Sequence, residues 1–289
     1  MKICVLGAGG LLGHMLIRTL GETNDVFGTT REQSNDRSPV ARFLSRKKWI
    51  SGVDACKIDT VEAIFSQNQF DLVINCVGLI KQRDSQVSDI EMMRINAEFP
   101  HLLAEIANRH DTRVLHISTD CVFSGARGNY LESDAPDPID SYGRSKLLGE
   151  LNDAKNLTLR TSHIGRELSV KKSFIEWLLS QRGQKINGYS RAIYSGLTTL
   201  ELSRLISRLI VTHQDLSGLY HVSSQPISKL EIINKLNVLL DLRVTVIPDS
   251  SVVIDRSLNS LSFQQTTGIT TPSWDTMLAD FCKDQKNYE

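Results

Sequence analysis

The chain has 289 residues, and its 33 basic and 33 acidic residues give a formal net charge of zero. This length is enough for one large domain with an ample core, and the balanced charge argues against nucleic acid or an anionic membrane as a partner. The N-terminal residues do not show a basic-then-apolar signal, so we expect no secretory leader, and no apolar run approaches the roughly 20 residues of a membrane span. We therefore expect a cytoplasmic protein.

The beginning of the chain combines three features in order. Lys2 to Leu6 is a short apolar run that predicts a strand, Gly7-Ala8-Gly9-Gly10-Leu11-Leu12-Gly13 follows directly, and apolar residues then recur at helical spacing from Leu12 to Leu20. A strand, a glycine turn and a helix are the context of the dinucleotide fingerprint. Gly7 would allow the tight turn, Gly10 the approach of a pyrophosphate and Gly13 close helix packing. The alternative is a purely structural glycine turn.

Strand-like and helical patterns alternate through the first half, which predicts βαβ units and a parallel sheet. The predicted strands are Lys2 to Leu6, Asp25 to Thr29, Asp71 to Asn75, Arg113 to Ser118 and Leu157 to Arg160. The predicted helices are Val61 to Gln67, Glu91 to Asn108, Tyr142 to Asn152, Phe174 to Gln181, Thr199 to His213 and Lys229 to Leu240. Parallel sheets bind ligands at the carboxyl ends of their strands. A disordered end is expected only over Lys286 to Glu289.

Two polar motifs follow these strands. Ser118-Thr119-Asp120 closes one strand, and Tyr142 and Lys146 stand four residues apart, so on a helix they face the same side. A phenol has a pKa of about 10, and a neighbouring ammonium lowers it by favouring the phenolate. The pair therefore suits proton transfer, although a surface Tyr and a surface Lys could match the same spacing.

Taken together, these motifs resemble the extended short-chain dehydrogenase/reductases. The resemblance rests on the glycine motif, on Asn75-Cys76-Val77-Gly78, on Ser118-Thr119-Asp120 and on the Tyr142 and Lys146 pair. The segment 118–125 is similar to the STDYVFDG pattern of the dTDP-4-dehydrorhamnose reductase branch, and the similarity continues at 218–222 and 255–258. The chain departs from that pattern at Cys121, where the branch has Tyr, and at Ser124, where it has Asp.

This resemblance implies an α/β fold with a Rossmann-type doubly wound parallel sheet and a smaller C-terminal substrate-binding region. Residues 1–161 would form the NADP(H)-binding Rossmann domain, with 199–222 returning to it. Residues 162–198 and 223–289 would form the substrate-binding region.

The resemblance also implies a reaction, the NADPH-dependent reduction of a nucleotide-linked 4-keto-6-deoxy sugar for cell-surface polysaccharide synthesis. Thr119, Tyr142 and Lys146 would be catalytic. Dehydratases of the superfamily follow Thr-Asp with Glu, but Cys121 stands there, which favours simple reduction. Two alternatives are a reductase or epimerase of a UDP-linked keto N-acetyl sugar and a non-catalytic cofactor-binding regulatory subunit.

The expected cofactor is NADPH, with NADH possible, because Thr30 and Arg31 follow the second strand and suit a 2′-phosphate. Asp59 would contact adenine or cap the next helix. The expected cofactor-binding residues are Gly7, Gly9, Gly10, Leu11, Leu12, Gly13, Thr30, Arg31, Asp59, Asn75, Val77, Gly78, Tyr142 and Lys146.

The expected substrate-binding residues are Lys81, Val122, Phe123, Arg191 and Arg256. The alternative for these arginines is that they are simply solvated, as loop arginines usually are. His163 occupies the position where the family contacts nicotinamide, and Asn96 would either support the site or make one structural hydrogen bond. Because no His, Cys or carboxylate cluster has zinc spacing, no metal site is expected. The partner is a nucleotide sugar, and a homodimer is expected by similarity to relatives.

Overall fold

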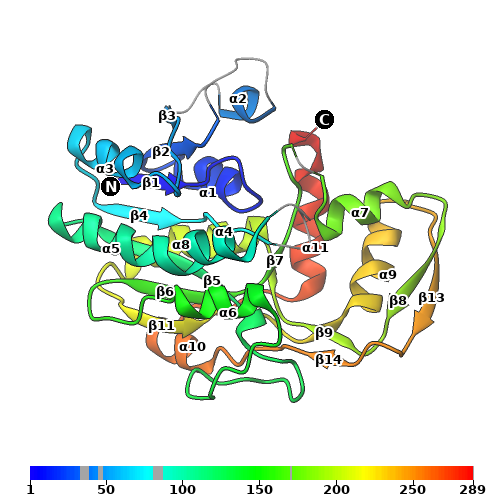
Figure 1. The fold of residues 1–289 in the computed structure, drawn as a ribbon. Helices are drawn as coiled ribbons and strands as arrows, with labels where there is room; N and C mark the ends of the chain where they lie inside the picture. Colours follow the sequence, from blue (N-terminus) through cyan, green and yellow to red (C-terminus); the bar gives the residue numbers. More distant parts are fainter. Residues whose placement is uncertain (33–38, 45–47, 81–86, 170, 289) are drawn as a thin grey trace.

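The structure, a computed structural model, describes residues 1–32, 39–44, 48–80, 87–169 and 171–288 (Figure 1). Within these residues, one sheet contains seven parallel strands in the order β11-β6-β5-β4-β1-β2-β3. The strands are β1 (Lys2–Leu6), β2 (Asp25–Thr30), β3 (Lys48–Ser51), β4 (Leu72–Asn75), β5 (Arg113–Thr119), β6 (Leu157–Thr161) and β11 (Gly218–His221). The predicted α/β fold with a Rossmann-type doubly wound sheet is confirmed.

Helices cover both faces of this sheet (Figure 1). Ile3 and Val5 of β1 pack into the core that contains α1 (Gly13–Leu20) and α8 (Thr199–Thr212). Cys4 and Leu6 point the other way, into the core that contains α3 (Ile58–Gln67) and α5 (Phe99–Arg109). A strand covered on both faces needs apolar side chains at every position, which explains the continuous apolar run of β1. The strand order reverses between β1 and β4, where such sheets open a crevice for ligands.

The predicted helix from Glu91 to Asn108 is three consecutive segments: α4 (Asp89–Met93), a π-helical turn η1 (Arg94–Glu98) and α5. The helix that carries Tyr142, α6 (Ser141–Leu148), ends before the predicted Asn152 because Gly149 forms its C-cap. A short 3₁₀ turn, η2 (Asp120–Val122), follows β5, and α2 (Pro39–Leu44) lies between β2 and β3.

The second half supplies a smaller group of short elements beside the sheet (Figure 1). Its helices are α7 (Phe174–Ser180), α9 (Lys229–Leu239), α10 (Leu261–Thr267), α11 (Trp274–Asp284) and the 3₁₀ turn η3 (Gln285–Asn287). Its strands pair as β7 (His163–Ile164) with β10 (Leu197–Thr198), β8 (Lys185–Tyr189) with β13 (Thr245–Asp249), and β9 (Ala192–Tyr194) with both β12 (Ile227–Ser228) and β14 (Ile254–Asp255). From the same half, α8 packs beside α1 and β11 pairs with β6. The division of the chain into two regions at the stated boundaries stays a prediction.

The expected disordered end over Lys286 to Glu289 is wrong for its described part. Residues 285–287 form η3, and the Tyr288 hydroxyl lies 2.7 Å from Nε2 of His14 in α1. Glu289 lies outside the described residues. Aromatic and ionic contacts to α1 order this segment, and a short polar sequence gives no signal of them.

Candidate active site

One cavity of about 500 Å³ opens at the carboxyl ends of β1, β4, β5 and β6. The glycine loop borders it through Gly10, Leu11 and Leu12, and the loop after β4 borders it through Val77 and Gly78. On other sides the lining comes from β5, α6 and the segment after β6, and the second half of the chain closes it with residues of α7, β9, α9 and β14. The motifs that sequence analysis placed at strand ends therefore meet in one hollow.

The glycine loop has the geometry that its residues allow. Gly7 has a φ of +78°, which side chains rarely adopt, and a Cβ on Gly13 would lie 2.1 Å from the Gly7 carbonyl oxygen. Only glycine can therefore occupy position 13 while α1 packs this closely on the loop. Gly9 faces Val40 of α2. Gly7, Gly9 and Gly13 shape the turn, and Gly10 faces the cavity.

Helix α6 places Tyr142 and Lys146 on the cavity wall. Asp140 caps the helix by accepting a hydrogen bond from Gly143 N at 2.7 Å. A Cβ on Gly143 would lie 2.2 Å from the Cys121 carbonyl oxygen, so the glycine next to Tyr142 lets α6 approach the turn that follows Thr119. Tyr142 and Thr119 both line the cavity.

Lys146 is almost completely withdrawn from water, with 4% of its surface exposed. Its Nζ donates to the Ile117 carbonyl oxygen at 2.7 Å and lies 3.2 Å from Nε2 of His116. Burial lowers the pKa of Lys146 to about 8, against the opposing effects of Glu150 and Cys76. Such a lysine is held in place by β5 and carries a proton that it can release near neutrality.

Behind Lys146 stands a histidine that sequence analysis did not identify. His116 is fully buried, and its Nδ1 lies 3.1 Å from the Asn75 amide nitrogen. Burial and then the charge of Lys146 lower the pKa of His116 well below its usual value, so the ring is neutral. The Asn75 side-chain oxygen accepts from Val77 N at 3.1 Å. Asn75 thus holds His116 and the loop that begins at Val77, and its own buried side chain does not line the cavity.

Asn96, in the π-helical turn, makes more than one structural hydrogen bond. Its side chain accepts from Leu79 N at 2.8 Å and donates to Leu79 O at 2.9 Å and to the Ser145 hydroxyl at 3.0 Å. It therefore ties the loop after β4 to α6 at the residue before Lys146. π-helical turns often occur at functional sites.

Thr119 is the last residue of β5 and is 6% exposed. Its hydroxyl accepts from Cys121 N at 3.1 Å and donates to the Asp120 carboxylate at 3.3 Å. Burial raises the pKa of Asp120, and Arg256 opposes that shift. Thr119, Asp120 and Cys121 all line the cavity, although Thr119 also caps the following turn, as a strand-end threonine commonly does.

The expected substrate contacts separate into four cases. Arg256 lines the cavity and donates to Cys121 Sγ at 3.2 Å and to Phe123 O at 3.0 Å. Val122 and Phe123 are fully buried in a small core with Tyr130 and Leu258, so their side chains are not available to a ligand. Arg191 is exposed and does not line the cavity, and Lys81 lies outside the described residues. Ser124 does not line the cavity either; its backbone N–H donates to Asp137.

Sequence analysis missed several residues that border the cavity from the second half of the chain. Tyr194 and Ile193 of β9, Lys229 of α9 and Phe174 of α7 line it, together with the expected His163. These residues come from short strands and helix ends without a motif. Their aromatic and basic side chains give the substrate side of the cavity both an apolar surface and positive charge.

The residues expected near the adenosine end lie at the edge of the sheet. Thr30 ends β2, and the exposed Arg31 follows it. Asp59 is exposed in the first turn of α3, whose N-cap is Lys57, so the prediction of Asp59 as N-cap is wrong. Asp54 instead lies just past β3, where its carboxylate accepts from Cys56 N at 3.0 Å.

Two further observations concern the described residues only. They contain no group of three or more His, Cys, Asp or Glu side chains that could hold a metal ion. None of the helices formed by these residues has the length and apolar character needed to cross a membrane.

Comparison with known proteins agrees with this geometry. The chain is 31% identical to the probable low-salt glycan biosynthesis reductase Agl14 of Haloferax volcanii, over 78% of this chain and 75% of that one. It is 27% identical to dTDP-4-dehydrorhamnose reductase of Aggregatibacter actinomycetemcomitans, over 78% and 74%. The fold matches dTDP-4-dehydrorhamnose reductase of Bacillus anthracis in complex with NADP, with a TM-score of 0.80 at 24% identity, covering 98% and 99%. Residues 1–287 match the family model described as the RmlD substrate binding domain, and the chain belongs to that family.

Proposed function

We propose that the protein reduces a nucleotide-linked 4-keto-6-deoxy sugar with NADPH, as a dTDP-4-dehydrorhamnose reductase does, for the synthesis of a cell-surface polysaccharide. The observation that carries this proposal is the convergence of the glycine loop, Thr119, Tyr142 and the desolvated Lys146 on one cavity. A regulatory subunit without turnover would not need a buried lysine beside a tyrosine in that cavity.

The residues present fit the cofactor. Gly10, Leu11 and Leu12 lie at the amino end of α1, where unpaired backbone N–H groups and the helix dipole favour a diphosphate. The exposed Arg31 after β2 suits a 2′-phosphate, which supports NADPH over NADH. The Bacillus anthracis enzyme, whose fold this chain shares, was solved with NADP.

In the proposed reaction, NADPH when bound supplies the hydride that adds to the keto carbon. The developing alkoxide needs a proton, and we assign its donation to Tyr142, which lines the cavity. The Thr119 hydroxyl polarises the keto oxygen by donating a hydrogen bond. The Lys146 ammonium stabilises the phenolate that Tyr142 becomes, and its low pKa of about 8 lets it pass a proton onward.

The decisive experiment is a substrate panel. Purified protein is incubated with dTDP- and UDP-linked 4-keto sugars, and loss of the NADPH absorbance is followed. The proposal requires turnover with a dTDP-linked 4-keto-6-deoxy sugar. Turnover only with a UDP-linked N-acetyl sugar would support the second candidate, and binding of NADPH without any turnover would support a regulatory role.

One observation favours that second candidate enough to keep it in the panel. Cys121 borders the cavity where the rhamnose branch has tyrosine, and its thiol contacts Arg256. A smaller side chain at this position leaves more room beside the sugar. The identity of the sugar and of the base is therefore decided by the panel and not by the fold.

We also propose a homodimer. Ile90 and Met93 of α4 and Leu148 of the adjacent α6 are 69%, 40% and 57% exposed, and neighbouring exposed apolar side chains suit a self-association surface. Light scattering should give twice the chain mass, and Ile90→Lys should shift the protein toward the monomer. A monomeric wild type would contradict this proposal.

A further inference from the structure

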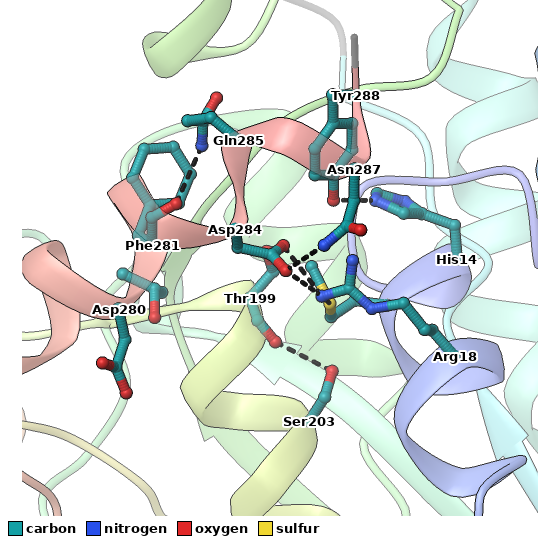
Figure 2. A network of polar contacts seen from close by, with 12 residues as sticks. His14, Arg18, Thr199, Ser203, Asp280, Phe281, Asp284, Gln285, Asn287 and Tyr288 are labelled. Atoms are coloured by element: carbon teal, nitrogen blue, oxygen red, sulfur yellow. Dashed lines mark hydrogen bonds and ion pairs between the residues drawn. The ribbon is translucent and has the colours of Figure 1, made fainter. Parts of the chain in front are cut away.

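The last described turn of the chain, η3, packs against α1, the helix that follows the glycine loop (Figure 2). Arg18 of α1 donates to both carboxylate oxygens of Asp284 at 2.7 and 2.8 Å, and Asn287 donates to the same carboxylate at 2.7 Å. These contacts hold η3 beside α1 and bring Tyr288 over His14. The function proposed above gives no role to this cluster.

His14 connects Tyr288 to the glycine loop. The ring is fully buried, with Nδ1 at 2.7 Å from the Gly10 carbonyl oxygen and Nε2 at 2.7 Å from the Tyr288 hydroxyl. A carbonyl oxygen can only accept, so Nδ1 carries the proton, and in the neutral ring Nε2 must then accept from the Tyr288 O–H. Burial lowers the pKa of His14 to about 4, so the neutral ring is the form present near neutrality.

The hydrogen bond from His14 determines how a peptide of the glycine loop is turned. The backbone N–H of His14 reaches the Gly10 carbonyl only at 3.4 Å, so the ring provides the shorter contact at 2.7 Å. In a trans peptide the C=O and the following N–H point in opposite directions. Holding the Gly10 carbonyl toward His14 therefore turns the Leu11 N–H away from it, and Gly10 and Leu11 both border the cavity.

We propose that Tyr288 is a positioning residue for binding of the cofactor's diphosphate: by donating to Nε2 it fixes the His14 tautomer that holds the Gly10 carbonyl and leaves the Leu11 N–H for a phosphate oxygen. This inference rests on the proposed function. The wrong tautomer would set the Nδ1 lone pair against the Gly10 carbonyl oxygen, and the peptide would lose its fixed orientation.

The Tyr288 ring is itself held by contacts that do not involve its hydroxyl. It stacks on Phe43 of α2 at 6.5 Å between ring centroids, and the Arg166 guanidinium lies 5.3 Å from its centre. Arg166 in turn donates to Glu176 of α7 at 2.7 Å. A Tyr288→Phe variant therefore keeps its packing and loses only the donor, which makes it a clean test.

The test measures the dissociation constant of NADPH by the change in its fluorescence. Tyr288→Phe should raise the dissociation constant of NADPH by about three- to tenfold, the effect of one lost hydrogen bond. It should leave kcat at saturating NADPH unchanged. Adenosine 2′-monophosphate, which has no diphosphate, should bind both proteins equally. Tyr220→Phe, at the sheet edge formed by β11, is the matched control and should bind NADPH as the wild type does.

A second variant tests the order of the contacts. His14→Leu should weaken the binding of NADPH at least as much. Adding Tyr288→Phe to this variant should weaken the binding no further, because both residues act through the same hydrogen bond to the Gly10 carbonyl. In ¹⁵N spectra, His14 of the wild type should show the Nδ1–H tautomer. An unchanged NADPH constant in Tyr288→Phe, additive losses in the double variant, or an Nε2–H tautomer would each overturn the inference. A wild type that fails to bind NADPH would instead overturn the proposed function.

Discussion

Replacing Lys146 by Met should change the stability of the protein in a pH-dependent way. The pKa of Lys146 is about 8 in the fold against 10.5 for an exposed lysine, so between these values the unfolded chain binds more protons than the native state. Wild-type stability should therefore rise with pH across this window, whereas the Met variant lacks this contribution. The full shift corresponds to about 3 kcal/mol. The stability of Lys146→Met relative to the wild type should fall by about 2 kcal/mol between about pH 7.5 and about pH 9.5.

Urea denaturation followed by tryptophan fluorescence measures this difference, since the chain has three tryptophans. Other titrating groups are common to both proteins and cancel. Lys283→Met is the control because the Lys283 side chain is 79% exposed, and its stability relative to the wild type should not depend on pH. Parallel stability curves for Lys146→Met and the wild type would refute the claim that burial holds down the pKa of this lysine.

Three further predictions test the surroundings of the site. Arg31→Ala should weaken the binding of NADPH by about tenfold or more and leave the binding of NADH unchanged, since charge-assisted hydrogen bonds to a 2′-phosphate are lost. Equal losses of affinity in titrations with both cofactors would place the 2′-phosphate elsewhere. Glu150→Gln should lower the free energy of unfolding by about 3–5 kcal/mol, because it leaves the charge of the buried Arg160 unpaired. The control is Glu62→Gln, whose ion pair with Arg109 is exposed and whose loss should cost about 1 kcal/mol or less. Similar urea midpoints for the two variants would contradict this prediction. His116→Leu removes a hydrogen-bond partner of Lys146 and should lower kcat about tenfold without changing the NADPH dissociation constant; unchanged steady-state kinetics would show that Lys146 does not need His116.

The sequence predicted β1 and β4, which are buried on both faces, because their apolar runs are nearly continuous. It missed β3, an edge strand in which polar residues flank two apolar ones. It also missed the short strands of the second half, such as β9 and β14, because each has two or three residues and pairs with a distant segment. Pairing of this kind depends on tertiary contacts and leaves no period in the sequence.

Motif spacing predicted that Thr119, Tyr142 and Lys146 face one cavity, and all three line it. The spacing gave no information about how deeply each side chain is buried. Lysine is rarely buried, so nothing in the spacing indicates that Lys146 is only 4% exposed. His116 did leave a signal, since a polar residue inside an otherwise apolar strand needs a buried partner. Val122 and Phe123 were expected to bind the substrate, yet their apolar side chains pack into a core instead.

The claim at the centre of this account is that Tyr142 supplies the proton when the keto group is reduced. Single-turnover oxidation of bound NADPH by dTDP-4-dehydrorhamnose, compared between the wild type and Tyr142→Phe, tests it most directly. The variant should bind NADPH as tightly as the wild type and react about 10²- to 10⁴-fold more slowly. Equal rates in the two proteins would contradict the account.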